Sequence, residues 1–177
     1  MTASNIDGLK EILPDFAKDI RLNLSSVLAA DDASGLTQNQ VLGVALASAY
    51  ASRNTVVIEV IRGEAAALSS EEVNAAKAAA TIMAMSNIYY RSTYMTGDDE
   101  IGKLPAGLRM NVIGNPGVDK VTFKLYSLGV SAVNGCSACI SAHTRKALVE
   151  GISKVGVQHT FRIAAVIFAA AQAVSIT

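Results

Sequence analysis

The chain has 177 residues, and its 15 basic and 15 acidic side chains give a formal net charge of zero. This balance argues against nucleic-acid binding, which normally requires an excess of Lys and Arg. Hydrophobic residues make up 51% of the chain and charged residues only 17%, which excludes intrinsic disorder of the whole and favours a buried subunit interface. The length fits a single domain over 1–177.

The N-terminal segment does not have the pattern of a signal peptide, because Asp7, Lys10 and Glu11 interrupt its apolar residues. The most hydrophobic window, 163–176, is shorter than the ~18 residues that a membrane span needs. It predicts a buried core or interface helix. We expect no membrane association and a cytoplasmic location, where thiols stay reduced unless they carry out redox chemistry.

Alanine-rich runs and apolar residues at helical spacing predict an all-α protein, a multi-helix bundle. Pro14 is expected in the first turn of a helix that runs to about Leu28. Phe16, Ile20 and Leu24 would form one apolar stripe on this helix. A polar loop is expected to follow it.

Two capping boxes, Thr37 with Gln40 and Ser69 with Glu72, predict the starts of two further helices. Asn54 is expected to cap a helix between them. The helices predicted in this half lie at 37–52, 54–67 and 69–94, after the loop at 31–36.

The polar, glycine-containing stretch 96–107 is the main internal break, and 115–117 reads as a turn. The helices predicted beyond it lie at 119–133, 137–150 and 157–174, with a break at Asn134-Gly135 and a C-terminal cap at Gly151.

Two short segments, 85–90 and 132–137, show a weak internal similarity. Each follows an apolar helix, and the two place Asn87 and Asn134 alike. This pattern suits two helical repeats, at about 37–95 and 105–177.

Both cysteines lie in Cys136-Ser137-Ala138-Cys139, and His143 follows four residues later. On a helix that starts near Gly135, these three side chains share one face. The helix N-terminus stabilises a thiolate at Cys136 and lowers its pKa, which makes the thiol a nucleophile. His143 lies one turn beyond Cys139 and can exchange a proton with it. The spacing also allows a disulfide, so the motif predicts a redox site.

Two other interpretations of these residues stay open. The cysteines could be small buried hydrophobic residues. Alternatively, Cys136, Cys139, His143 and His159 could together bind zinc, although His159 lies in an apolar helical stretch. Redox chemistry is the favoured interpretation, because the two cysteines of the chain stand three apart beside a glycine break.

The helix before the thiols carries a polar stripe at three- and four-residue spacing. Its members are Lys124, Ser127, Ser131 and Asn134. The stripe is either a solvated helix face or a polar channel that carries a proton or water to Cys139.

Sequence blocks along most of the chain accompany the thiol motif. They lie at 13–20, 22–28, 51–54, 82–85, 87–91, 108–113, 115–117 and 130–136, followed by Cys139 and 142–143. Together they resemble the alkylhydroperoxidase D (AhpD) family of the carboxymuconolactone decarboxylase-like superfamily. Cys-X-X-Cys alone is a loose motif, but the three-residue gap to His143 and the flanking blocks make this match specific.

The resemblance implies an all-helical subunit that forms a homotrimer and reduces organic hydroperoxides with thiols, without metal, haem or bound cofactor. In that family the residue matching Cys139 attacks the peroxide and becomes a sulfenic acid. The residue matching Cys136 donates a proton and resolves the sulfenic acid to a Cys136–Cys139 disulfide. The residue matching His143 relays a proton, through water, to a glutamate on the preceding helix.

The resemblance also implies partners. Electrons would come from the dithiol of a lipoylated acyltransferase, which a dihydrolipoamide dehydrogenase recharges. Such proteins also reduce a peroxiredoxin through a mixed disulfide.

Two positions depart from the family pattern. Lys124 stands where the family has the relay glutamate, and Ala138 stands where the family usually has a histidine. A protonated Lys cannot accept the relayed proton, although a cation near the thiols lowers their pKa. We therefore expect dithiol–disulfide cycling with weaker peroxidase turnover than in members that have the full motif.

Three other functions compete with the peroxidase. The protein could be a thiol–disulfide carrier with little direct peroxidase activity, or a non-redox helical protein whose thiols are idle. Decarboxylase activity is less favoured, because that branch of the superfamily requires no cysteine pair.

Overall fold

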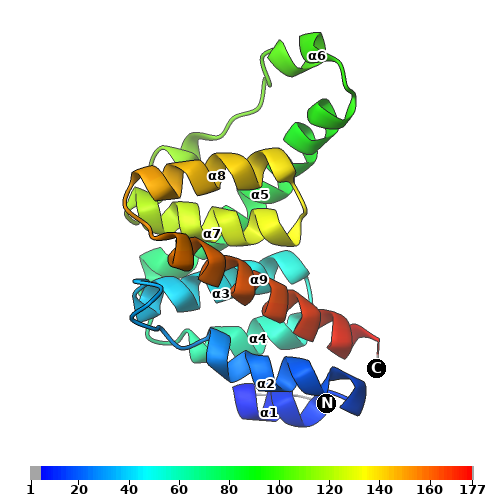
Figure 1. The fold of residues 1–177 in the computed structure, drawn as a ribbon, viewed down its shortest axis with the longest axis vertical. Coiled ribbons are helices and arrows are strands. Elements are labelled where there is room, and N and C mark those ends of the chain that lie inside the picture. Colours follow the sequence, from blue (N-terminus) through cyan, green and yellow to red (C-terminus); the bar gives the residue numbers. More distant parts are fainter. Residues whose placement is uncertain (1–4, 177) are drawn as a thin grey trace.

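The computed structural model describes residues 5–176, and over that range it is built of helices with no strand (Figure 1). This confirms the predicted all-α class. The elements are α1 (Ile6–Ile12), η1 (Asp15–Ala17), α2 (Lys18–Val27), α3 (Gln38–Ser52), α4 (Thr55–Glu64), α5 (Ser70–Met95), α6 (Asp99–Lys103), η2 (Asn111–Ile113), α7 (Lys120–Val133), α8 (Ser137–Val149) and α9 (Lys154–Ser175), where η marks a 3₁₀ turn.

Helices α3 and α9 lie at the middle of the molecule and join two groups of helices (Figure 1). Helices α1, α2 and α4 lie at the end that also holds both termini. Helices α5, α7 and α8 form the other group, and α5 continues beyond it into an arm that ends in α6. The main core therefore runs through the central helices into both groups, and a smaller cluster of Leu128, Ala147 and Val157 lies beneath α8.

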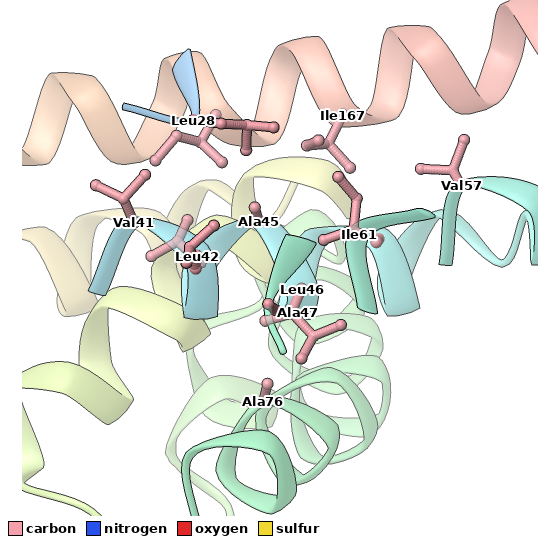
Figure 2. Packing of buried hydrophobic residues seen from close by; sticks show 14 of the residues in the cluster. Leu28, Val41, Leu42, Ala45, Leu46, Ala47, Val57, Ile61, Ala76 and Ile167 are labelled. Atoms are coloured by element: carbon pink, nitrogen blue, oxygen red, sulfur yellow. The ribbon is translucent and has the colours of Figure 1, made fainter. Parts of the chain in front are cut away.

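The core is centred on α3, in which all nine residues from 41 to 49 are buried. A helix that is apolar all round must be covered on every side, and α3 packs against α4, α5, α7 and α9. Figure 2 shows Ala45 and Ala47 among larger neighbours such as Ile167 of α9. The small alanine side chains allow these helix backbones to approach closely.

Side chains cap the helix starts as the sequence predicted. In α3 the Thr37 hydroxyl accepts from the Gln40 N–H, while the Gln40 side chain accepts from the Thr37 N–H. Ser69 and Glu72 make the same reciprocal pair at α5. Asn54 caps α4 through the N–H of Val57. Each cap satisfies backbone donors that have no partner inside the helix.

The helix predicted over 14–28 is wrong at its start. Leu13 is extended, as expected for a residue before proline, and it ends a short helix, α1, that the sequence analysis missed. Residues 15–17 then form η1, and α2 begins only at Lys18. Phe16 is therefore 69% exposed rather than part of the apolar stripe, while Leu24 is fully buried.

Three other boundaries also differ from the prediction. Helix α4 ends at Glu64 instead of near Ala67, and the predicted break at 96–107 contains the short helix α6. Helix α9 begins at Lys154, after the N-cap Ser153. It has the length and hydropathy of a membrane span, as no other helix within 5–176 does, but half of its apolar window is buried in the protein. It packs against α2, α3 and α7, which confirms a core helix.

Candidate functional site

The site begins at the turn between α7 and α8. Gly135 adopts φ +65°, and its N–H donates to the carbonyl of Ala132, while the N–H of Cys136 donates to the carbonyl of Ser131. This bond pair is a Schellman motif, which ends a helix by means of a residue in the left-handed conformation. The break predicted at Asn134-Gly135 is thereby confirmed.

Cys136 is also the N-cap of α8. Its Sγ atom accepts the backbone N–H of Cys139 at 3.3 Å, and the Cα atoms of the two cysteines are 5.3 Å apart. The two sulfurs form a disulfide, and both residues are buried. The thiol pair therefore lies at the end of a helix where backbone N–H groups and the helix dipole favour negative charge on sulfur.

A cavity of about 290 Å³ opens beside Cys139. It lies between α5, η2 and α8, and much of its lining is apolar: Met83, Met110, Ile113 and Ala142. Polar groups reach it from Ser86, Tyr90, His143 and Lys146. An apolar cavity with a few polar groups around a reactive sulfur suits a small organic molecule.

His143, one turn beyond Cys139 on α8, lines the same cavity. Its Nδ1 atom is buried and has no hydrogen-bond partner within residues 5–176. Burial, together with the positive charges of Lys146 and Lys124, lowers the pKa of His143 to about 4. The imidazole is therefore neutral at pH 7.

Lys124, at the position of the family's relay glutamate, forms an ion pair with Glu150. Glu150 is the C-cap of α8, so this pair ties α7 to the far end of the helix that begins at the cysteines. The Lys124 side chain is only 18% exposed, which limits screening of its charge by water.

The polar stripe on α7 is not a solvated face, because Ser127 and Ser131 are buried. Ser131 accepts a hydrogen bond from Asn87 of α5, and Asn134 donates one to the same residue. Lys124, Ser131 and Asn134 therefore pair with residues of α5 or at the end of α8, whereas the Ser127 hydroxyl is buried without a hydrogen-bond partner within residues 5–176.

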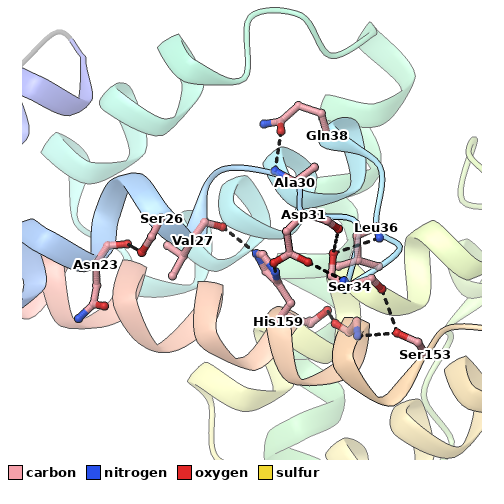
Figure 3. Close-up of polar contacts among 12 residues, drawn as sticks. Asn23, Ser26, Val27, Ala30, Asp31, Ser34, Leu36, Gln38, Ser153 and His159 are labelled. Carbon is pink, nitrogen blue, oxygen red and sulfur yellow. Dashed lines mark hydrogen bonds and ion pairs between the residues drawn. The ribbon is translucent and has the colours of Figure 1, made fainter.

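His159 lies away from the thiols and against the loop at 28–37 (Figure 3). Its Nε2 atom is 3.0 Å from the carbonyl oxygen of Val27, and its Nδ1 atom is 3.3 Å from the Asp31 carboxylate. The zinc set of Cys136, Cys139, His143 and His159 is thus not brought together. In the part of the chain that the structure describes, no group of three or more His, Cys, Asp or Glu could hold a metal ion.

Sequence reasoning did not assign three residues to the site. Glu150, the partner of Lys124, stood only as the end of the predicted helix 137–150. Arg91, which donates to the carbonyl of Asn134, stood only within the 87–91 block of the family resemblance. Asn87 belonged to the same block and to the weak internal similarity with Asn134, and the structure shows these two side chains hydrogen-bonded at 3.0 Å.

Known proteins that are similar to this chain belong to one family. Residues 99–176 match the model of the carboxymuconolactone decarboxylase family, a segment that contains the thiols and His143. A protein of Coxiella burnetii (strain RSA 493 / Nine Mile phase I), named alkyl hydroperoxide reductase AhpD, is 53% identical over 164 residues, which cover 92% of this chain and 93% of that protein.

Two more relatives carry the same name. The protein of Rhodospirillum centenum is 53% identical over 94% of this chain and 89% of its own length. That of Streptomyces coelicolor is 48% identical over 92% of this chain and 90% of its own length. On this similarity across nearly the full chain, the protein belongs to the AhpD family of the carboxymuconolactone decarboxylase-like superfamily.

Proposed function

We propose that the protein is a dithiol peroxidase that reduces organic hydroperoxides. The observation that carries this proposal is the Cys136–Cys139 disulfide at the start of α8, beside an apolar cavity that Cys139 and His143 line. The relatives named alkyl hydroperoxide reductase support the same peroxidase-type activity.

The first step takes place at Cys139, which lines the cavity. The thiolate attacks the distal oxygen of the hydroperoxide, the O–O bond breaks, and the leaving alkoxide takes a proton to become the alcohol. Cys139 is then a sulfenic acid. The lining methionines and Ile113 favour an apolar organic group over hydrogen peroxide, because burying that group in the cavity removes apolar surface from water.

The second step regenerates the disulfide. Cys136 attacks the Cys139 sulfur, the S–O bond breaks and water leaves. The two electrons that reduced the peroxide now have to be replaced from outside. We propose that a lipoyl dithiol on an acyltransferase supplies them, recharged by a dihydrolipoamide dehydrogenase, and that the protein also reduces a peroxiredoxin. We also propose that the protein is cytoplasmic, forms a homotrimer and binds no cofactor.

A thiol–disulfide carrier is the second candidate, and one observation favours it. Lys124 occupies the position of the relay carboxylate, and its ammonium is paired with Glu150. With no carboxylate at residue 124 to receive the relayed proton, direct peroxide turnover would be slow while dithiol exchange continued.

The deciding experiment is a free-thiol titration of the reduced protein before and after one equivalent of cumene hydroperoxide, with mass mapping of Cys136 and Cys139. Rapid loss of both thiols and appearance of their disulfide is the expected result. Thiols that persist with peroxide but oxidise readily with a disulfide donor would favour the carrier. Thiols inert to both reagents would contradict any redox function.

A further inference from the structure

Asn87 of α5 connects the two ends of the last turn of α7. Its side chain is completely buried. The Nδ2 atom donates to the hydroxyl of Ser131 at 3.0 Å, and the Oδ1 atom accepts from the side chain of Asn134 at 3.0 Å. One helical turn later, the Arg91 guanidinium donates to the main-chain carbonyl of Asn134.

These contacts hold the same turn that presents Cys136. The carbonyl of Ser131 accepts the N–H of Cys136, and Asn134 is the C-cap that precedes Gly135. Neither Asn87 nor Arg91 is among the described residues that line the cavity at Cys139. Asn87 also donates to the Sδ atom of Met83, a lining residue of that cavity, at 3.8 Å. The shorter bonds of both residues go to the turn, so we expect them to act on the chemistry through the turn rather than through contact with a substrate.

We propose that Asn87 and Arg91 are positioning residues that keep the Cys136 sulfur within reach of Cys139. Their kinetic role rests on the proposed function, in which Cys136 attacks the sulfenic acid of Cys139. The S–O bond then breaks, the S–S bond forms, and the departing hydroxide takes a proton to become water. A fixed turn raises the effective concentration of one sulfur at the other.

The first test uses Asn87→Ala and traps the sulfenic acid. Reduced protein receives one equivalent of cumene hydroperoxide in the presence of dimedone, and the adduct on Cys139 is quantified by mass spectrometry. We expect about a tenfold rise in adduct over wild type, the effect of losing a buried hydrogen-bond pair, while the first peroxide-consuming step keeps its rate. Asn74→Ala is the matched control, since Asn74 is an exposed asparagine of the same helix.

Arg91 provides a second, less buried position that tests the same proposal if Asn87→Ala does not fold. Arg91→Met is expected to raise the adduct several-fold. Arg91→Lys, which keeps a cationic donor, is expected to restore it to near the wild-type level. A general loss of packing would not be rescued by this conservative change.

An equilibrium measurement separates the proposal from the peroxidase activity. The Cys136–Cys139 disulfide is equilibrated with reduced and oxidised dithiothreitol, which needs no peroxide. We expect reduction to become about tenfold more favourable in Asn87→Ala, because a loose turn weakens the closed disulfide. If the wild type did not consume peroxide, the proposed function would fail. This equilibrium would still test whether Asn87 and Arg91 hold the turn at Cys136. Equilibria and adduct yields that match wild type in Asn87→Ala and Arg91→Met would overturn the proposal.

Discussion

The imidazole of His143 is largely buried, and this burial together with the charges of Lys146 and Lys124 lowers its pKa to about 4. An ordinary thiol has a pKa near 8.5, so moving its proton onto His143 is unfavourable by about 6 kcal/mol. The imidazole therefore serves better as a neutral hydrogen-bonding group in a proton path than as the base that holds the proton. Negative charge on the thiol pair is favoured instead by the start of α8, where the helix dipole acts and the backbone N–H of Cys139 donates to the Cys136 sulfur.

The low pKa of His143 predicts a pH dependence of stability. Because the folded pKa lies below the ordinary 6.5, the unfolded chain takes up the proton first as the pH falls. The stabilisation from the neutral ring is complete above pH 6.5 and is lost as the pH falls toward 4. Between pH 7 and 4.5, the disulfide-bonded wild type should lose about 2 kcal/mol more unfolding free energy than His143→Gln. Urea titrations at both pH values measure this difference, and an equal loss in the two proteins would contradict it.

Helices α3 and α7 cross where each contributes a glycine. A Cβ atom on Gly43 would lie 2.0 Å from the hydroxyl of Tyr126, which is fully buried, and one on Gly129 would lie 3.1 Å from Ser48. The hydroxyl of Tyr126 is itself buried without a hydrogen-bond partner within residues 5–176. The tyrosine ring thus fills the space that the missing side chain of Gly43 leaves, and this contact sets the helix spacing.

Gly43→Ala should therefore be strongly destabilising. The added methyl group overlaps the Tyr126 ring, which is fully buried, and overpacking of this kind costs about 3 kcal/mol. Gly102→Ala in α6 is the control, because a Cβ atom there meets nothing within 4 Å. It should leave stability unchanged or raise it by about 0.5 kcal/mol through helix propensity. Thermal and urea unfolding of both variants test this expectation, which fails if their stabilities are equal.

The ion pair between α7 and α8 gives a prediction for activity. Lys124→Glu alone would place two carboxylates together, because Glu150 now faces Lys124. The double variant Lys124→Glu/Glu150→Lys reverses the pair and supplies the relay carboxylate. We expect it to raise peroxide turnover by about tenfold, the low end of the effect of a positioned acid–base group. Glu150→Lys alone is the control and should bring no gain. Turnover that is the same in all of these proteins would show that residue 124 is not part of the proton path.

The elements that the sequence predicted best are those with local signals. Thr37 and Ser69 define helix starts through partners three residues away, and Gly135 ends α7 through its own backbone conformation. The hydrogen bonds of Asn87 reach Ser131 and Asn134, which lie 44 and 47 positions further along the chain. Only the packing of α5 against α7 reveals these contacts. Phe16 was misplaced for a different, local reason: its spacing suits an α-helix, but residues 15–17 form a 3₁₀ turn and α2 begins only at Lys18.

At the scale of the whole molecule, apolar side chains gather on the arm that α5 and α6 form. Tyr94 is 71% exposed, Met95 75% and Leu104 63%. Helix α5 carries the first two beyond the rest of the bundle (Figure 1). Exposed apolar side chains on a projecting segment are typical of a surface that another subunit covers. This arm is therefore the best candidate for the interface of the proposed trimer.

The arm makes the oligomeric state testable. If the arm residues pack against a neighbouring subunit, Tyr94→Glu/Met95→Glu should bury charge in the interface and convert the trimer to monomers. Phe16→Glu/Leu22→Glu is the control, because both residues are as exposed, at 69% and 68%, but lie at the opposite end of the molecule. Sedimentation velocity of the wild type and both variants measures the outcome. A monomeric wild type would contradict the proposed assembly. A trimer that persists with the arm substitutions would show that the interface lies on another face.

Tyr90 lines the cavity at Cys139 and lies one turn before Tyr94 on the same helix. Loss of the trimer should therefore also alter access to the thiols.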